Sequence, residues 1–223
     1  MLPIRSAAVL AAALLASAAT AAPLPSPAPP PAGSIEGHVT FSRMAPARVA
    51  NRYPGAGGGA SHAAGVVPAV AYLVGATAEG APESRTRPRL VQQDTSFRPP
   101  LLVIPVGGSV DFPNRDPFFH NVFSYSSAKR FDLGRFPRGE SRTVTFDRPG
   151  VVKVYCEIHQ WMRSAVVVVE NPYFDEIGSD GRFTLTGVPA GRYRLAVWDF
   201  DRGQRIVNVT VPAQGSVRVD VSL

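Results

Sequence analysis

Cysteine is nearly absent from this sequence, because it occurs once in 223 residues, as Cys156. A single thiol excludes an intramolecular disulfide, and it excludes zinc and iron-sulfur sites that need several cysteines. Histidine is also scarce, with four residues, too few for a protein with several histidine-rich copper centres. The chemistry of Cys156 must therefore come from its neighbours.

Long hydrophobic runs are missing beyond the N-terminus. After Arg5, an apolar run from Ala7 to Ala19 leads into small residues, which is the layout of a secretory signal peptide over residues 1–21. The run is shorter than the roughly 20 residues of a membrane-spanning helix, so we expect a mature chain without a transmembrane segment, in the periplasm or secreted. The alternative is an uncleaved membrane anchor. The proline-rich residues 22–33 predict a stiff linker.

Positively charged residues outnumber negatively charged ones, which gives a net charge of +6. The arginines are scattered among turns, without a recognition helix or an array of stacking aromatics, so nucleic acid is not the expected partner. An acidic protein partner is one use of this charge, and simple solubility is the other.

Turn-forming residues are abundant, with 20 Gly and 22 Pro, and no long amphipathic helix pattern accompanies them. The pattern predicts an all-β chain of short strands, with a central β-sandwich over residues 34–171 that includes a Gly-rich loop at 51–65. Its strands are expected at 35–41, 66–74, 101–104, 109–112, 120–125, 141–146, 151–155 and 165–170.

Residues 172–223 have a separate strand rhythm and predict a small second β-sandwich module. Strands are expected at 182–186, 192–198, 205–211 and 216–222, with inward-facing Phe183, Leu185, Tyr193 and Leu195. The glycine-bracketed pair of strands resembles carboxypeptidase-regulatory-like modules, which are grouped with carbohydrate-binding-like folds. Because this module is short, the strands at 35–41 and 66–74 could belong to it instead.

Three side chains with metal-binding chemistry share one short loop. Cys156, His159 and Met162 follow one another at intervals of three residues, between two apolar strands. Each alone is more often a packing or hydrogen-bonding residue. Together with His120 from an earlier strand, they form the two-His, one-Cys set with a weak axial Met that holds a mononuclear copper ion. The sequence therefore predicts a copper site.

The segments 114–122 and 155–162 resemble the cupredoxins, most closely the amicyanin and plastocyanin-like branch, and the likeness extends over 97–170. The resemblance implies a Greek-key sandwich with His120, Cys156 and His159 as equatorial ligands and Met162 as the axial one. It also implies that Asn121 ties the ligand loops together. Glu157 and Ile158 depart from the family pattern between Cys and His, and an inward Glu157 could ligate the metal.

The resemblance implies an exported blue-copper electron carrier that is not an enzyme. Electrons would leave through His159, inside an apolar docking patch with Trp161 and residues 117–119, although core packing is an equal alternative for Trp161. The partner would be a redox protein, a dehydrogenase or cytochrome with an acidic surface, and the amicyanin branch suggests methylamine oxidation.

Two other functions compete with electron transfer. A thiol hydrolase would use Cys156 and His159, but no third orienting group is placed and Met162 would have no role. A secreted copper-binding, carbohydrate-binding or protein-binding module without a redox role is the other alternative. His38 and His62 have no predicted partners.

Overall fold

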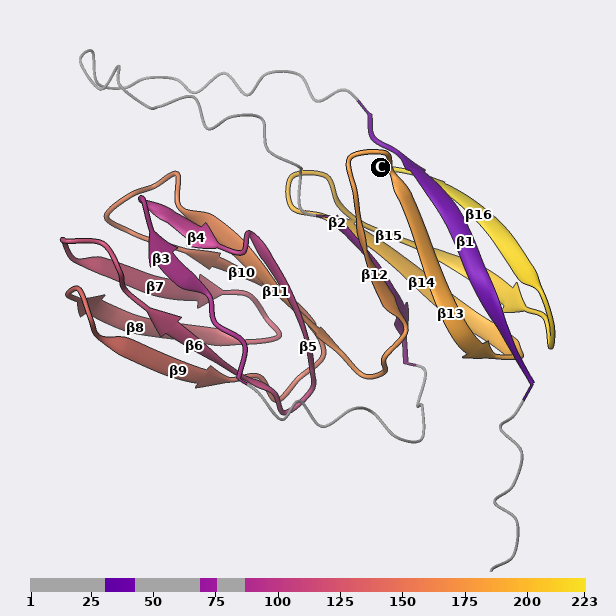
Figure 1. The fold of residues 1–223 in the computed structure, drawn as a ribbon, viewed down its shortest axis with the longest axis horizontal. Coiled ribbons are helices and arrows are strands. Elements are labelled where there is room, and N and C mark those ends of the chain that lie inside the picture. The colour runs from indigo at the N-terminus through magenta and orange to yellow at the C-terminus, as the bar shows by residue number, and fades with distance from the viewer. Residues whose placement is uncertain (1–30, 43–68, 76–86) are drawn as a thin grey trace, which may run out of the picture. The chain divides into compact units, whose positions relative to one another are not determined.

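The computed structural model describes residues 31–42, 69–75 and 87–223, and all of its regular elements are strands (Figure 1). Over these ranges, no helix has the length and apolar character needed to cross a bilayer. The predicted signal peptide 1–21, the linker up to residue 30 and the Gly-rich loop 51–65 lie outside the described residues. The predicted all-β fold class is confirmed.

The middle of the chain forms the first sandwich, which carries the four residues predicted to bind a metal. One sheet has the order β5-β11-β10-β7-β8, and two-stranded sheets β6-β9 and β3-β4 accompany it. Its core includes the fully buried Phe112, Phe136 and Phe146. The strands are β3 (Val91–Gln93), β4 (Ser96–Arg98), β5 (Leu101–Pro105), β6 (Ser109–Pro113), β7 (His120–Tyr125), β8 (Arg130–Phe136), β9 (Ser141–Thr145), β10 (Gly150–Tyr155) and β11 (Arg163–Val169).

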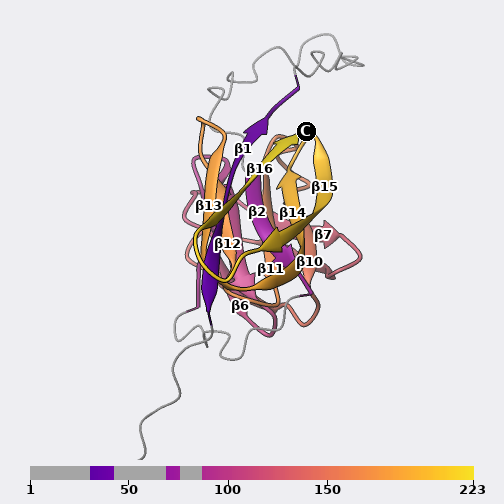
Figure 2. The same cartoon turned by 90° about the vertical axis from the view of Figure 1, so that its right-hand side faces the viewer.

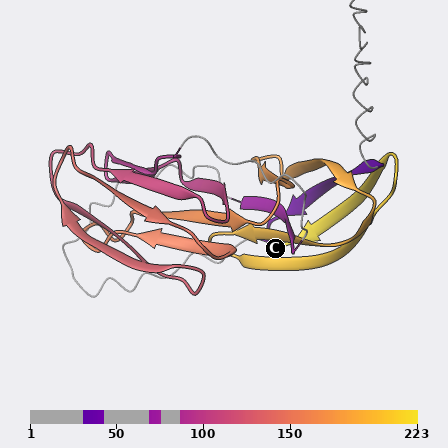
Figure 3. The same ribbon diagram turned by 90° about the horizontal axis from the view of Figure 1, so that it is seen from below.

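The second sandwich has two sheets around its own core. A sheet of order β13-β1-β16 packs against one of order β12-β2-β14-β15, and both contribute to one buried apolar cluster (Figures 2 and 3). Phe183, Leu185 and Leu195 are buried there as predicted, and Tyr193 is partly buried. The strands are β1 (Ala32–Thr40), β2 (Ala69–Val74), β12 (Phe174–Ile177), β13 (Arg182–Pro189), β14 (Gly191–Asp199), β15 (Gly203–Val211) and β16 (Ser216–Ser222).

The predicted boundary at residue 34 needs correction, because the two N-terminal strands belong to the second sandwich. β1 pairs antiparallel with β13 and parallel with β16, while β2 lies between β12 and β14. The physical reason is burial: the strands after residue 172 need partners to close two layers over a shared core. The alternative that assigned 35–41 and 66–74 to this module is the arrangement observed.

The central position of β1 explains one glycine. A Cβ atom at Gly37 would collide with the ring of Phe183 and with the backbone oxygen of Val219. Only a residue without a side chain lets β13 and β16 approach β1 this closely.

Candidate metal centre

Neighbouring strands bring the predicted ligands to one end of the first sandwich. His120 is the first residue of β7, and Cys156 directly follows the last residue of β10. The two strands are paired through Tyr155 and Phe123, so His120 lies beside the loop that leads from Cys156 to β11. Residues 36 positions apart in sequence therefore meet at one site.

The side chains of His120, Cys156 and His159 converge, with their potential ligand atoms all within 4.8 Å of one another. The Nδ1 atoms of His120 and His159 are 3.1 Å apart, and Cys156 Sγ lies 3.9 Å from His120 Nδ1. His120 and Cys156 are buried, whereas His159 is partly exposed. The structure thus brings together three of the four predicted ligands around one point.

Met162 is the last residue of the same loop, and it is buried in the core of the first sandwich. Its backbone oxygen accepts a hydrogen bond from the Cys156 amide at 3.3 Å, and its own amide donates to the His159 carbonyl at 2.9 Å. The side chain is 1% exposed and belongs to the same buried cluster as Cys156. These contacts hold Met162 next to the three converging residues.

The far nitrogen of His120 is held by a carboxylate. His120 Nε2 lies 2.7 Å from Asp116 Oδ2, and both side chains are buried. An ionised carboxylate can only accept this hydrogen bond, so Nε2 is the donor and Nδ1 is the nitrogen that faces Cys156 and His159. Asp116 therefore fixes the tautomer that a metal ligand needs.

Asp116 is itself positioned by a tight turn between β3 and β4. The amides of Asp94 and Thr95 donate to its two carboxylate oxygens at 2.7 and 2.9 Å. Both residues have positive φ angles, 52° and 51°, which is costly for a β-branched residue such as Thr95. Burial pushes the pKa of Asp116 up, but the hydrogen bonds from His120, Thr95 and Asp94 together outweigh it and lower the pKa below its ordinary value.

Asn121 links the two ligand segments, as the family resemblance implied. Its side-chain oxygen accepts a hydrogen bond from the Glu157 amide at 2.9 Å, and its amide group donates to Asp132 at 3.0 Å. The Glu157 side chain is half-exposed and pairs with Arg135. Glu157 therefore points away from the cluster, and the predicted possibility of an inward carboxylate is not what the structure shows.

Aromatic residues surround His159 at the surface. Its ring centroid lies 5.4 Å from that of Phe118 and 5.3 Å from that of Trp161. Phe119 and Trp161 are 54% and 47% exposed, so Trp161 is a surface residue and not part of the core. Burial lowers the pKa of His159, and the nearby His120 lowers it further against the opposing charge of Asp116. A neutral imidazole is thus favoured here.

The residues fit a mononuclear copper ion. Nitrogens 3.1 Å apart, with a sulfur 3.9 Å from one of them, match the spacing around a first-row ion bound at about 2.0–2.1 Å to nitrogen and about 2.3 Å to sulfur. Within the described part of the chain, no further His, Cys, Asp or Glu joins this group. Two imidazoles and one thiol suit copper, which accepts soft and borderline ligands in a trigonal set.

Asp116 and the turn at Asp94 and Thr95 are the functional residues that sequence reasoning missed. Asp116 lies within the segment that resembles the cupredoxins, four residues before His120, but this spacing gave no signal of its own outside a helix. Residues 91–98 also lacked a clear strand pattern. The hydrogen bonds from Asp94 and Thr95 to Asp116 are seen only in the structure, because they join residues that are about 20 positions apart in the sequence.

No protein-family model matches the chain, and no curated protein does either. Among solved structures, a purple cupredoxin from Nitrosopumilus maritimus is 26% identical and covers 37% of this chain and 99% of its own, with a TM-score of 0.34. A copper-containing nitrite reductase from Thermus scotoductus SA-01 is 27% identical, covering 44% of this chain and 25% of its own, with a TM-score of 0.37. A reduced Cu(I) form of an amicyanin mutant is 21% identical, covering 44% and 98%, with a TM-score of 0.36.

Proposed function

We propose that this protein is an exported electron carrier with one type 1 copper ion, held by His120, Cys156 and His159 with Met162 as the axial ligand. The observation that carries the proposal is the convergence of two Nδ1 atoms and one thiol sulfur within 4.8 Å at one end of a β-sandwich. Bound copper would supply a one-electron Cu(I)/Cu(II) couple. The chain would hold the ligands in nearly the same place in both oxidation states.

The chain's own contacts support a rigid ligand set. Asp116 holds His120, Asn121 holds the start of the Cys156 loop, and backbone hydrogen bonds close that loop at Met162. Such supporting contacts limit ligand movement when the metal changes charge. Rigid support is what fast electron transfer requires, and a hydrolase would instead need an exposed nucleophile.

The surface around His159 supports docking of a redox protein. Phe118, Phe119, Ile158 and Trp161 are all between 37% and 54% exposed, and small apolar surfaces of this kind suit transient encounters. The net charge of +6, to which the predicted signal peptide contributes one positive charge through Arg5, leaves the mature chain basic and favours a partner with an acidic surface, because opposite charges speed association. Dehydrogenases and cytochromes are the classes we propose, with the periplasm or the exterior as the place of action.

The experiment that tests the proposal is copper loading of the purified mature protein, followed by optical and electron paramagnetic resonance spectroscopy. We expect one copper per chain, an intense visible band from thiolate-to-Cu(II) charge transfer, and reversible reduction. A colourless Cu(II) protein would contradict electron transfer and favour the alternative of a copper-binding module without a redox role.

The axial role of Met162 gives a separate prediction. Replacing Met162 with Gln puts a harder oxygen donor in place of a soft thioether, which favours Cu(II) over Cu(I) and lowers the reduction potential. A tenfold change in that preference corresponds to about 59 mV for one electron. Protein-film voltammetry measures the shift, and retained copper stoichiometry is the control. An unchanged potential means that Met162 is not the axial ligand.

A further inference from the structure

The loop that carries Cys156, His159 and Met162 begins and ends at one pair of residues. Tyr155 is the last residue of β10 and directly precedes Cys156. Arg163 is the first residue of β11 and directly follows Met162. Tyr155 and Arg163 are paired with each other, and residues 156–162, which we call the ligand loop, connect them. A contact that holds this pair in place therefore also holds both ends of the ligand loop.

Both residues of this pair contact the second sandwich. Residues 31–223 form one compact unit, and in it the turn between β14 and β15 (residues 200–202) lies against β10 and β11. The Arg163 guanidinium donates to the two carboxylate oxygens of Asp201 at 2.6 and 3.0 Å. The Phe200 ring packs edge-on against the Tyr155 ring, with 6.1 Å between the ring centroids. One turn thus reaches both ends of the ligand loop.

Two cationic side chains of the first sandwich hold Phe200. Arg163 Cζ lies 4.8 Å from the centroid of its ring, and Lys153 Nζ lies 4.7 Å from it. The Lys153 ammonium also donates to the Phe200 carbonyl at 2.9 Å. Phe200 is 5% exposed, in an apolar cluster to which both sandwiches contribute, and cation–π contacts gain strength when water is excluded. The turn is therefore anchored by apolar packing and by charge.

The turn between β14 and β15 has a fixed conformation of its own. Asp199 is fully buried, and its Oδ1 accepts hydrogen bonds from the amides of Asp201 and Arg202 at 3.0 and 2.7 Å. Gly203 closes the turn with a φ angle of +84°, which residues with a side chain rarely adopt. Asp201 is thus presented to Arg163 in one orientation.

We propose that the β14–β15 turn is a positioning element that holds the ligand loop in its metal-binding conformation. Asp201 acts through Arg163, and Phe200 acts through Tyr155. The inference rests on the proposed copper site. Contacts outside the ligand set keep metal ligands in place, and here they come from a different sandwich from the one that carries the proposed ligands. The second sandwich therefore supports metal binding through its contact with the first.

Amide hydrogen exchange, followed by nuclear magnetic resonance on the metal-free mature protein, tests the proposal without copper. The amides of Cys156 and Met162 donate hydrogen bonds within the ligand loop, so their exchange reports how often the loop opens. Asp201→Ala removes the partner of Arg163 and should speed exchange at both amides about fivefold.

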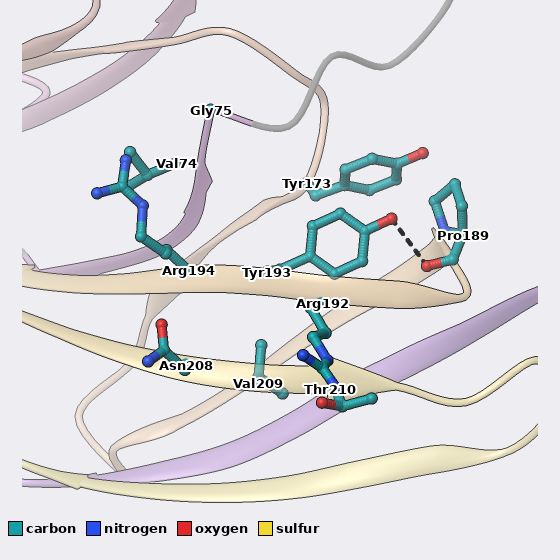
Figure 4. Close-up of a pocket in the computed structure, with 10 residues that line it drawn as sticks. All are labelled: Val74, Gly75, Tyr173, Pro189, Arg192, Tyr193, Arg194, Asn208, Val209 and Thr210. Carbon is teal, nitrogen blue, oxygen red and sulfur yellow. Dashed lines mark hydrogen bonds between the residues drawn. The ribbon is translucent and has the colours of Figure 1, made fainter.

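A second variant shows whether Asp201 acts through Arg163. Because the two side chains form one ion pair, the double variant of Asp201→Ala and Arg163→Ala should exchange no faster than Arg163→Ala alone. Asp220→Ala is the matched control for the aspartate, since Asp220 pairs with Arg218 on β16 of the second sandwich. Arg192→Ala is the matched control for the arginine, because Arg192 is exposed near the opposite end of β14, where it lines the pocket in Figure 4.

The copper-loaded protein gives a readout at the metal itself. We expect Asp201→Ala to change the copper hyperfine splitting in the electron paramagnetic resonance spectrum, which depends on ligand geometry, and to speed transfer of Cu(I) to a chelator about fivefold. Asp220→Ala should change neither. If the wild-type protein takes up no copper, the electron-transfer proposal fails, and the exchange measurement still decides whether the turn holds the ligand loop.

Three results overturn the positioning role. Unchanged exchange at Cys156 and Met162 in Asp201→Ala shows that the turn does not hold the ligand loop. An equal increase in Asp220→Ala shows that any weakening of the second sandwich has the same effect. Additive effects of Asp201→Ala and Arg163→Ala show that Asp201 does not act through Arg163.

Discussion

Replacing Cys156 with Ser is expected to abolish the visible absorption band of the copper-loaded protein completely. The band requires charge transfer from a thiolate, and a serine hydroxyl at the same place is a hard, protonated oxygen that supplies none. Cys156 Sγ is the only thiol in the chain, so no other residue can replace it. Visible absorption after stoichiometric addition of Cu(II) gives the result directly.

The serine variant needs a folding check, because Cys156 is 3% exposed and a buried hydroxyl without a partner costs about 1–3 kcal/mol. Cys156→Ala, which buries no polar group, serves as the second variant, and circular dichroism reports the fold of both. His38→Ala is the matched control, since His38 lies on β1 of the second sandwich. A band that persists in folded Cys156→Ala contradicts ligation by the thiol.

The strands of this protein could be located from sequence where alternation was regular and turns were marked. The predicted strands at 120–125 and 216–222 coincide with β7 and β16: flanking turn residues mark β7, and regular apolar alternation marks β16. β8 was missed, since Gly134 interrupts the alternation of Phe131 and Leu133 and no residue before Phe136 is fully buried. Local pattern therefore predicts a strand only when one face is clearly apolar.

Which sandwich a strand joins could not be read from its own residues. β1 has the expected alternation, with Ile35 and Val39 buried, but its partners β13 and β16 lie far along the chain. The residues of β1 do not indicate that it pairs in parallel with β16, because this pairing joins segments that are far apart in the sequence. The correction of the boundary at residue 34 has this cause.

The candidate site was more accessible to sequence reasoning than the contacts that support it. His120, Cys156 and His159 were identifiable by residue chemistry, since few other residues in the chain can hold a soft metal. Asp116 was not, because carboxylates are common on surfaces and its role depends on burial against His120. Residue type is enough to predict candidate metal ligands. The residues that orient those ligands can be identified only from their positions in the folded structure.

Asp116→Ala is expected to weaken copper binding by about 10- to 100-fold, the usual effect of removing an outer partner of a metal-ligating histidine. The carboxylate holds the proton on His120 Nε2, so its loss frees the ring to rotate and to place a proton on Nδ1. Asp116→Asn keeps the shape and one acceptor oxygen, so its loss of affinity should be smaller. Competition with a Cu(I) chelator measures the copper affinity of each variant. Asp147→Asn is the control, because Asp147 is an exposed aspartate that pairs with Lys129.

The same residue predicts a pH dependence in the metal-free protein. The folded-state pKa of Asp116 is lowered from its ordinary value of 3.8, so its ionised form stabilises the fold above that pH. This stabilisation is lost as the pH falls through the lower folded-state pKa. In urea unfolding, the wild-type protein should therefore have a larger free energy of unfolding than Asp116→Asn at neutral pH. This difference should become smaller below about pH 4. If the difference in the free energy of unfolding stays constant with pH, the charge of Asp116 does not hold His120 and the turn at Asp94 and Thr95 in place.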